Sequence, residues 1–269
     1  MKIATKITSI VLILALIACT KVPITGRRQM LLVPESELMS MSLTQYQQFL
    51  TENPPVADNV EATKQVRRVG GRIANAVERY LKDNGQSKLV KNYRWEFNLV
   101  NQNVVNAWAM PGGKVVVYQG ILPVAKTDEG LAVVMGHEIA HAVARHGNER
   151  MSQGILAAAG GVALAVYMRE KPSETQALFL AAYGVTAGVG MMAFGRNQES
   201  EADKLGMVFM SMAGYQPTEA IPFWDRMNAA SGGTSVPEFL STHPHYDTRV
   251  ERIKEWLPTA ETYYTPYQP

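Results

Sequence analysis

The chain has 269 residues, 46% of them hydrophobic, which is enough to bury one sizeable core. The formal net charge is only +2, and lysines and arginines form no basic stripe interleaved with aromatic residues. This argues against a nucleic-acid partner, because a strong positive field is the usual mark of that class. The chain has one cysteine, which excludes an internal disulfide and a zinc site made of paired cysteines.

The N-terminus has the pattern of a bacterial lipoprotein signal. A short basic segment precedes a mostly apolar run, Ile7–Ala18, which is too short to span a bilayer comfortably. Leu-Ile-Ala-Cys at 16–19 resembles a lipobox, in which the signal is cut before a cysteine that is then acylated. We therefore predict a signal peptide at residues 1–18 and a membrane anchor on lipidated Cys19. The alternative is an ordinary signal peptide with an incidental cysteine.

The mature chain is expected to have a tether and one domain. Residues 19–55 contain several prolines and predict a membrane tether and lead-in segment with a first helix over Glu35–Leu50. Residues 56–269 would form the domain. Thr20 follows Cys19, where an aspartate would resemble the signal for inner-membrane retention, so we expect the periplasmic face of the outer membrane.

The first half of the domain combines a long helix with strands. Apolar residues recur at helical spacing over Ala57–Asp83, and alternation over Tyr93–Val100 predicts a strand. Asn106–Met110 and Lys114–Tyr118 flank Pro-Gly-Gly, which predicts a bend or hairpin followed by a β-rich edge. The fold class that follows is α+β and mainly α.

The second half is predicted to be helical. Gly154–Tyr167 and Glu174–Phe194 are rich in small residues and predict a helical hairpin, which we place in the buried core rather than in a membrane. Further helices are predicted over Gln198–Met212, Pro217–Ala229 and Thr248–Trp256.

The most informative motif is His-Glu-Ile-Ala-His at 137–141. It lies in a helix that Thr127 or Asp128 can cap and that should continue to about Met151. Residues four apart differ by about 40° around a helix, so both histidines project from one face. Two such imidazoles suit tetrahedral zinc, and Glu138 stands beside them as a general base.

A catalytic zinc needs a third protein ligand. His146 lies nine residues after His137, on the opposite side of a continuous helix, and predicts a surface or helix-end histidine. Glu199 is the better ligand, because Glu199 and Asp203 are four apart and share a helical face. Asp203 would then accept a hydrogen bond from the far nitrogen of a ligand histidine. Glu201 points away from both acids.

The alternative for this acidic cluster is a solvated helix face, which is what most charge clusters are. The surrounding segment is otherwise apolar and built of small residues, which favours the ligand interpretation.

Several ordered motifs resemble the gluzincin family of zinc metalloproteases that includes the CAAX prenyl protease, HtpX, BepA and LoiP. They are Val22–Gln29, Asn106–Gly113, Gly136–His141, Glu199–Asp203 and Thr242–Arg249. The resemblance covers most of the mature chain, and the lipid-anchored, short-tailed layout is most similar to LoiP. It implies a metalloprotease domain with an active-site helix, a small sheet with a substrate-binding edge strand, and a small-residue hairpin.

The family resemblance also implies roles for individual residues. His137, His141 and Glu199 would hold one catalytic zinc, and Glu138 would pass a proton to the leaving amine. The substrate would pair with an edge strand made of Val115, Val116, Val117 and Tyr118, which favours unfolded or loop segments.

The resemblance places His243 near the metal, where it would steady an oxyanion or close the site as a fourth ligand. Arg249 would then hold the nearby loop or the charge on the tetrahedral intermediate. The alternative for His243 is a structural His-Pro turn with a surface histidine.

These features predict a zinc endopeptidase that acts on misfolded or unassembled proteins of the bacterial envelope. A chaperone-like assembly factor with gated or secondary proteolysis is the main alternative. An intramembrane protease is a third, and it requires residues 154–167 to cross the bilayer. The sequence gives no indication of the oligomeric state.

Overall fold

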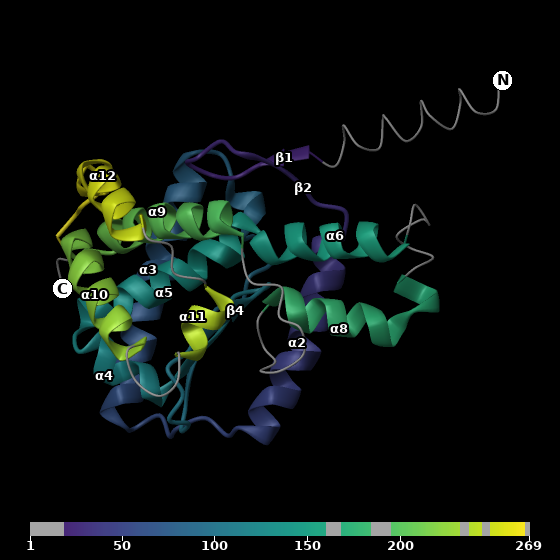
Figure 1. The fold of residues 1–269 in the computed structure, drawn as a ribbon, viewed down its shortest axis with the longest axis horizontal. Helices are drawn as coiled ribbons and strands as arrows, with labels where there is room; N and C mark the ends of the chain where they lie inside the picture. Colours follow the sequence, from purple (N-terminus) through teal and green to yellow (C-terminus); the bar gives the residue numbers. More distant parts are fainter. Residues whose placement is uncertain (1–18, 160–167, 184–194, 232–236, 244–247, 267–269) are drawn as a thin grey trace.

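The computed structural model describes residues 19–159, 168–183, 195–231, 237–243 and 248–266 (Figure 1). The predicted signal peptide lies outside the described residues, as do parts of the predicted small-residue hairpin at 160–167 and 184–194. Within the described ranges, we find no helix with the length and apolar character needed to cross a bilayer.

The described elements are mainly helical, as the sequence predicts. In chain order they are β1 (Cys19–Lys21), β2 (Arg28–Met30), α2 (Glu35–Glu52), α3 (Glu61–Asp83), η1 (Ser87–Leu89), β3 (Glu96–Val100), β4 (Ala107–Met110), β5 (Lys114–Tyr118), η2 (Gln119–Ile121), α4 (Leu122–Ala125), α5 (Asp128–Ala144), α6 (His146–Ala159), α8 (Pro172–Tyr183), α9 (Arg196–Met212), η3 (Pro217–Glu219), α10 (Ala220–Ser231), α11 (Glu238–Thr242) and α12 (Arg249–Glu261).

The main sheet has three strands in the order β3-β5-β4, with β5 parallel to β3 and antiparallel to β4. The predicted β4–β5 hairpin is therefore present, but β5 is the central strand. The prediction that Val115, Val116, Val117 and Tyr118 form a free edge is wrong, because neighbouring strands pair with both sides of β5. A continuous buried run of valines is typical of such a doubly covered strand.

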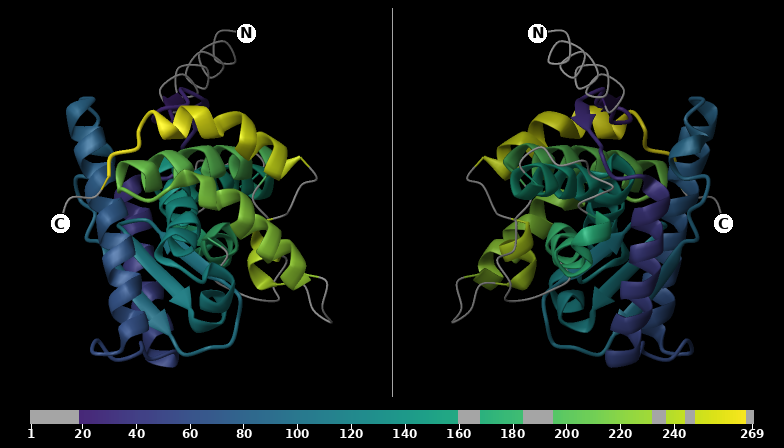
Figure 2. Two further views of the ribbon diagram at one scale, coloured as in Figure 1. Left: turned by 90° about the vertical axis from the view of Figure 1, so that its left-hand side faces the viewer. Right: turned by 90° about the vertical axis from the view of Figure 1, so that its right-hand side faces the viewer.

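The sheet separates two hydrophobic cores. Val115 and Val117 face a core shared with α3, α5 and α9, whereas Val116 and Tyr118 face a second core shared with α2, α6 and α8. Figure 2 shows α3 running along the sheet, and α12 lying across α9 on the side away from it. The molecule is thus layered in this order: the sheet, then α5, then α9, then α12.

Two glycines allow α5 and α9 to approach closely. A Cβ atom on Gly206 would lie 2.8 Å from the backbone nitrogen of His137, and one on Gly136 would lie 2.8 Å from the Gly206 carbonyl oxygen. Both contacts involve backbone, which has little freedom to move aside. The pair therefore sets the distance between the helix that carries the histidines and the helix that carries the acids.

The active-site helix is shorter than the sequence predicts. Thr127 caps α5 as expected, by accepting a hydrogen bond from the Gly130 backbone N–H. The helix ends at Ala144 instead of near Met151, because Arg145 takes a left-handed conformation with φ 61° and ψ 33°. The chain then continues as a separate helix, α6, which begins at His146. Arg145 is held there by an ion pair with Glu35 at 3.3 Å.

Where it is described, the predicted small-residue hairpin is present as α6 packed against α8. A Cβ atom on Gly147 would lie 2.1 Å from the Tyr183 ring, so this contact also depends on a glycine.

Replacing Gly206 by alanine should destabilise the protein by ~1–3 kcal/mol, because the new methyl group meets backbone atoms of α5. Gly71→Ala in α3 is the matched control, since a Cβ there meets nothing within 4 Å, and it should be stabilising by about 0.5–1 kcal/mol. Urea denaturation measures both free energies of unfolding. Equal values for the two variants would contradict the close-packing argument.

Candidate metal centre

Four donor groups, from two helices and from the residue that follows a third helix, converge inside the molecule. His137 and His141 project from α5, Glu199 from the first turn of α9, and His243 follows α11. One ligand atom from each lies within 4.8 Å of the other three, and all four residues are buried. The structure thus brings together the three predicted ligands and the histidine whose place the sequence left open.

Four of the six distances between the donor atoms are close to the edge length of a zinc tetrahedron. His137 Nε2 lies 3.0 Å from His141 Nε2 and 3.2 Å from His243 Nδ1. Glu199 Oε1 lies 3.3 Å from His141 Nε2 and 3.0 Å from His243 Nδ1. Bonds of about 2.0–2.1 Å to a tetrahedral ion place its ligand atoms about 3.3 Å apart. The donor set therefore fits zinc.

The buried charges also favour a divalent cation. Glu138, Glu199 and Asp203 are three buried carboxylates, and Arg249 is the buried guanidinium that faces two of them. Burial alone would raise the pKa of Glu199, but its histidine neighbours hold the pKa well below the usual range. Burial by itself would lower the pKa of His137. Its carboxylate partners, Asp203 and Glu199, have the larger effect and raise this pKa to about 9. This negative potential would attract a metal ion as it attracts a proton.

His243 occupies the fourth corner of this arrangement. Its Nδ1 atom faces the other donors, while its Nε2 atom lies 3.3 Å from Glu138 Oε1. The ring stacks on Phe239 at 4.6 Å between centroids and is only 2% exposed. The alternative of a surface histidine is therefore wrong. The rest of the His-Pro motif, at residues 244–247, lies outside the described residues.

A carboxylate and an arginine stand behind His137. Asp203 Oδ1 lies 2.9 Å from His137 Nδ1, which is the orientation that the spacing of the acids predicts. Arg249 donates to Asp203 Oδ2 and to Glu199 Oε2, each at 2.7 Å, and lies 3.7 Å from the centre of the Trp224 ring. Arg249 is thus a positioning residue that holds the two acids. The role predicted for Arg249, holding the nearby loop or the charge on the tetrahedral intermediate, stays a prediction, because residues 244–247 lie outside the described residues.

His146 is the site residue whose position the sequence analysis misjudged. It is fully buried, and its Nδ1 atom lies 2.8 Å from Nδ1 of His141. Its Nε2 atom lies 3.0 Å from Glu201 Oε2. The prediction was a surface or helix-end histidine. His146 does stand at a helix end, as the first residue of α6, but the surface position is wrong. The prediction assumed a continuous helix, whereas the left-handed Arg145 separates α5 from α6. No periodic pattern indicated that break.

Glu138 lies between the metal cluster and β4, one of the two outer strands of the sheet. Its carboxylate accepts a hydrogen bond from the backbone N–H of Ala109 in β4. Burial raises its pKa, and the nearby histidines oppose that shift. A carboxyl group with a raised pKa is suited to accept a proton and return it.

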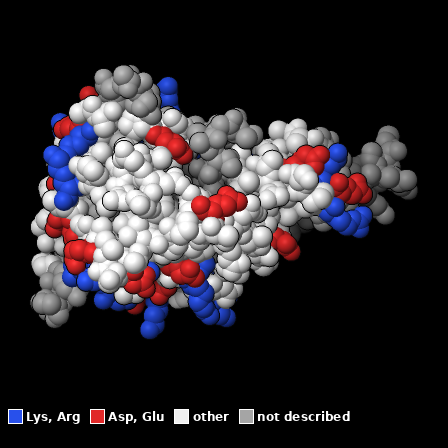
Figure 3. All heavy atoms as spheres, turned by 90° about the horizontal axis from the view of Figure 1, so that it is seen from below, with Lys and Arg blue, Asp and Glu red and all other residues white. Residues whose placement is uncertain are grey.

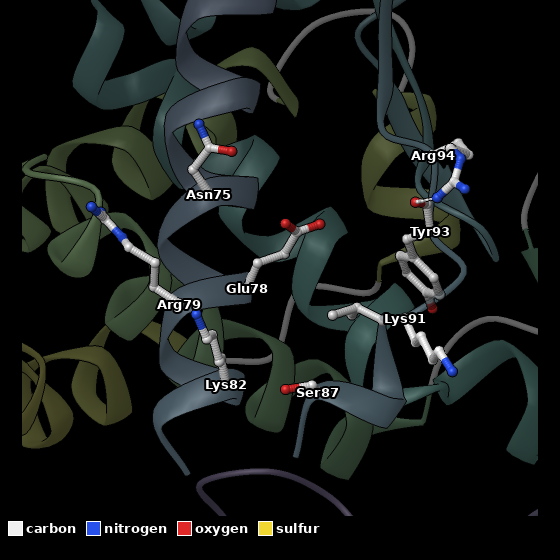
Figure 4. A pocket seen from close by; sticks show the side chains of 9 residues that line it. Asn75, Glu78, Arg79, Lys82, Ser87, Lys91, Tyr93 and Arg94 are labelled. Carbon is white, nitrogen blue, oxygen red and sulfur yellow. Dashed lines mark hydrogen bonds between the residues drawn. The ribbon is translucent and has the colours of Figure 1, made fainter. Parts of the chain in front are cut away.

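A separate surface pocket of about 610 Å³ lies between the C-terminal part of α3 and the segment before β3. Figure 4 shows that its side chains include Arg79, Lys82, Lys91 and Arg94. Tyr93, which also lines it, donates its hydroxyl to the Ala142 carbonyl near the end of α5. The pocket thus lies behind the active-site helix and contains none of the metal-cluster residues.

Two histidines and a carboxylate around a zinc-sized space, with a further glutamate beside them, define a metallohydrolase site. Residues 67–257 match Peptidase family M48, and the chain belongs to this family.

The chain is 36% identical over 194 residues to the mitochondrial metalloendopeptidase OMA1 of Schizosaccharomyces pombe, covering 70% of the chain and 53% of that protein. It is 36% identical over 185 residues to OMA1 of Saccharomyces cerevisiae, covering 66% and 51%. It is 30% identical over 166 residues to the beta-barrel assembly-enhancing protease of Escherichia coli, covering 58% and 33%. The chain therefore spans about half the length of these OMA1 relatives.

Zinc should stabilise the folded chain, because the donor cluster forms only on folding. Zinc at 100 times its dissociation constant should add about 2.7 kcal/mol to the free energy of unfolding, and a chelator should remove that gain. Thermal denaturation with and without zinc measures the effect. Glu199→Gln should abolish the gain, whereas Glu251→Gln, on the exposed face of α12, should preserve it. A zinc effect that survives in Glu199→Gln would contradict the ligand assignment.

Proposed function

We propose that the chain is a zinc-dependent endopeptidase that hydrolyses peptide bonds in misfolded or unassembled proteins of the cell envelope. The observation that carries this proposal is the convergence of His137, His141 and Glu199 around a zinc-sized space, with Glu138 beside it. Membership in Peptidase family M48 and the names of the similar metalloendopeptidases support the reaction type.

Zinc, when bound, supplies a polarising charge for the peptide carbonyl and for the attacking water. The proton is handled by the chain. Glu138 accepts it from the water and returns it to the leaving amine, and the Ala109 N–H orients the carboxylate for both transfers. The cluster is buried, and the aromatic rings of Trp224 and Phe239 pack against His137, which keeps competing water away.

The substrate would bind as an extended strand along β4. The backbone carbonyl of Asn106 accepts a hydrogen bond from the Tyr118 N–H. Because backbone groups alternate in direction along a strand, the backbone N–H and carbonyl groups of Ala107 and Ala109 point away from β5. Ala109 faces Glu138, so a strand added at this edge would present its peptide bonds near the general base. An extended backbone is available in unfolded chains and is already paired in folded sheets, which favours unfolded clients.

The envelope location rests on the sequence signal and on one bacterial relative. We propose that lipidated Cys19 anchors the chain on the periplasmic face of the outer membrane, where unassembled envelope proteins are its partners. The Escherichia coli relative is named a beta-barrel assembly-enhancing protease, which fits this location, whereas the OMA1 relatives are mitochondrial. The molecular face in Figure 3 has a broad uncharged area, with two acidic groups near its middle and other charged groups mainly towards the rim, and the uncharged area suits contact with neutral polypeptide.

A second candidate is a chaperone-like assembly factor with gated proteolysis. It is favoured by His243 Nδ1, which stands at the corner that a catalytic zinc leaves open for water. In this state the chain would bind clients without cleaving them.

Glu138→Gln should lower the rate of casein cleavage by ~10²–10⁴-fold, because it removes the proton acceptor and preserves the shape of the side chain. Zinc content should stay at the wild-type level. Glu129→Gln, in the first turn of the same helix, is the control and should cleave normally. Undiminished cleavage by Glu138→Gln would exclude the proposed mechanism. Rescue of an envelope defect in cells by this variant would favour the assembly factor.

His243→Ala should raise the initial rate of casein cleavage several-fold, because it vacates the fourth corner of the cluster. Zinc affinity should fall at the same time, since one donor is lost. Parallel measurement of initial rate and zinc content separates the two effects. A large loss of rate per bound zinc would instead show that His243 assists the reaction.

A further inference from the structure

The two histidine ligands on α5 differ in the hydrogen-bond partner of the ring nitrogen that points away from the metal cluster. His137 faces a carboxylate, Asp203, whereas His141 faces a second imidazole, His146. The second arrangement continues away from the metal cluster, and nothing in the proposed mechanism uses it.

The direction of each hydrogen bond in this second arrangement follows from the chemistry of the ligand. His141 presents Nε2 to the cluster, so its proton must lie on Nδ1. His146 Nδ1 must then accept that proton, which leaves the proton of His146 on Nε2. His146 Nε2 donates it to Glu201 Oε2 at 3.0 Å. With His141 bound to the metal through Nε2, His146 therefore connects this ligand to the Glu201 carboxylate.

The arrangement ends on the segment that follows Cys19. Arg27 donates from Nε to Glu201 Oε2 at 2.6 Å, and Thr25 donates to the other oxygen of Glu201. The remaining nitrogens of Arg27 form a two-pronged contact with Glu149, at 2.8 and 2.9 Å. Glu201 therefore has three hydrogen-bond partners, His146, Thr25 and Arg27.

The segment is fastened by other contacts as well. It forms the turn of a two-stranded hairpin in which Cys19 pairs with Met30 and Thr20 pairs with Gln29. Gln29 donates to the Ala144 carbonyl at 2.7 Å and so satisfies a group at the end of α5. In Figure 1 this hairpin lies beside α6, which begins with His146.

We propose that the segment Thr25–Gln29 is a positioning element of the metal site, and that Arg27 acts on the ligand His141 through Glu201 and His146. The proposal rests on the proposed zinc function, since it concerns the same cluster. Releasing the segment would leave Glu201 and Glu149 without their guanidinium partner. Glu201 would then hold His146 less firmly, and His146 would hold the His141 ring less firmly. Metal affinity and docking of the segment next to Cys19 are thus coupled.

The test compares neighbouring arginines in the full chain, purified in detergent. Arg27→Gln removes the contact with Glu201, whereas Arg28→Gln changes an exposed arginine in the same hairpin. Zinc affinity is measured by competition with a chromogenic chelator. We expect ~10-fold weaker binding for Arg27→Gln and wild-type binding for Arg28→Gln, since outer partners of metal ligands contribute ~10–100-fold. Equal affinities in the two variants would overturn the proposal.

Variants of His146 test the central link. His146→Phe removes the acceptor for His141 and should weaken zinc binding by ~10–100-fold, whereas His146→Asn retains an acceptor near Nδ1 and should recover part of the loss. The visible spectrum of the Co²⁺-loaded chain should change in His146→Phe and in Arg27→Gln, because it reports ligand geometry. An unchanged spectrum together with a lower melting temperature of the metal-free chain would show a merely structural role and overturn the proposal.

Both readouts are independent of the reaction. A wild-type chain that binds zinc and cleaves no protein would contradict the proposed endopeptidase and still allow the arginine comparison to be decided. In the double variant Arg27→Gln/His146→Phe, the loss of affinity should be smaller than the product of the single losses, because both changes interrupt the same path. Multiplicative losses would count against a connected path.

Discussion

The close approach of α5 and α9 is the constraint on which the rest of the structure depends. Gly136 and Gly206 leave the two backbones in direct contact, one residue before the first ligand histidine and three residues after Asp203. At that separation Glu199 reaches His141 and Asp203 reaches His137. A side chain at either glycine would separate carboxylates from imidazoles, and the cluster would no longer match the dimensions of a metal ion.

Such a cluster concentrates buried charge, and two arginines from distant parts of the chain balance it. Arg249, at the start of α12, holds Asp203 and Glu199 behind His137. Arg27, in the turn of the N-terminal hairpin, holds Glu201 and Glu149 behind His146. Unpaired buried carboxylates would be costly, so the acids, the histidines and the arginines form one interdependent network. The two ends of the chain thereby contribute to a site whose ligands come mostly from its middle.

The same packing relates the metal site to the sheet. Because β5 is covered on both sides, β4 is the strand that lies next to α5, and the Ala109 N–H reaches Glu138. His243 stands on the other side of Glu138 and completes the tetrahedron of donors. The general base therefore lies between the strand edge that would receive a substrate and the histidine that closes the cluster, so a movement of His243 would alter both metal coordination and the setting of the base.

The sequence alone determined the features that arise from local spacing. Residues four apart share a helical face, so His137 with His141 and Glu199 with Asp203 could be assigned to one metal site, and alternation gave the strands and the hairpin. Only the tertiary structure decided that β5 is central, because strand order depends on pairing between distant segments. It also decided that His146 faces His141. A single left-handed residue, Arg145, ends one helix before the next begins, and this break leaves no mark on the periodic pattern of the sequence. The partnership of Arg27 with Glu201 joins residues 174 positions apart, and such contacts are fixed by the packing of the whole chain.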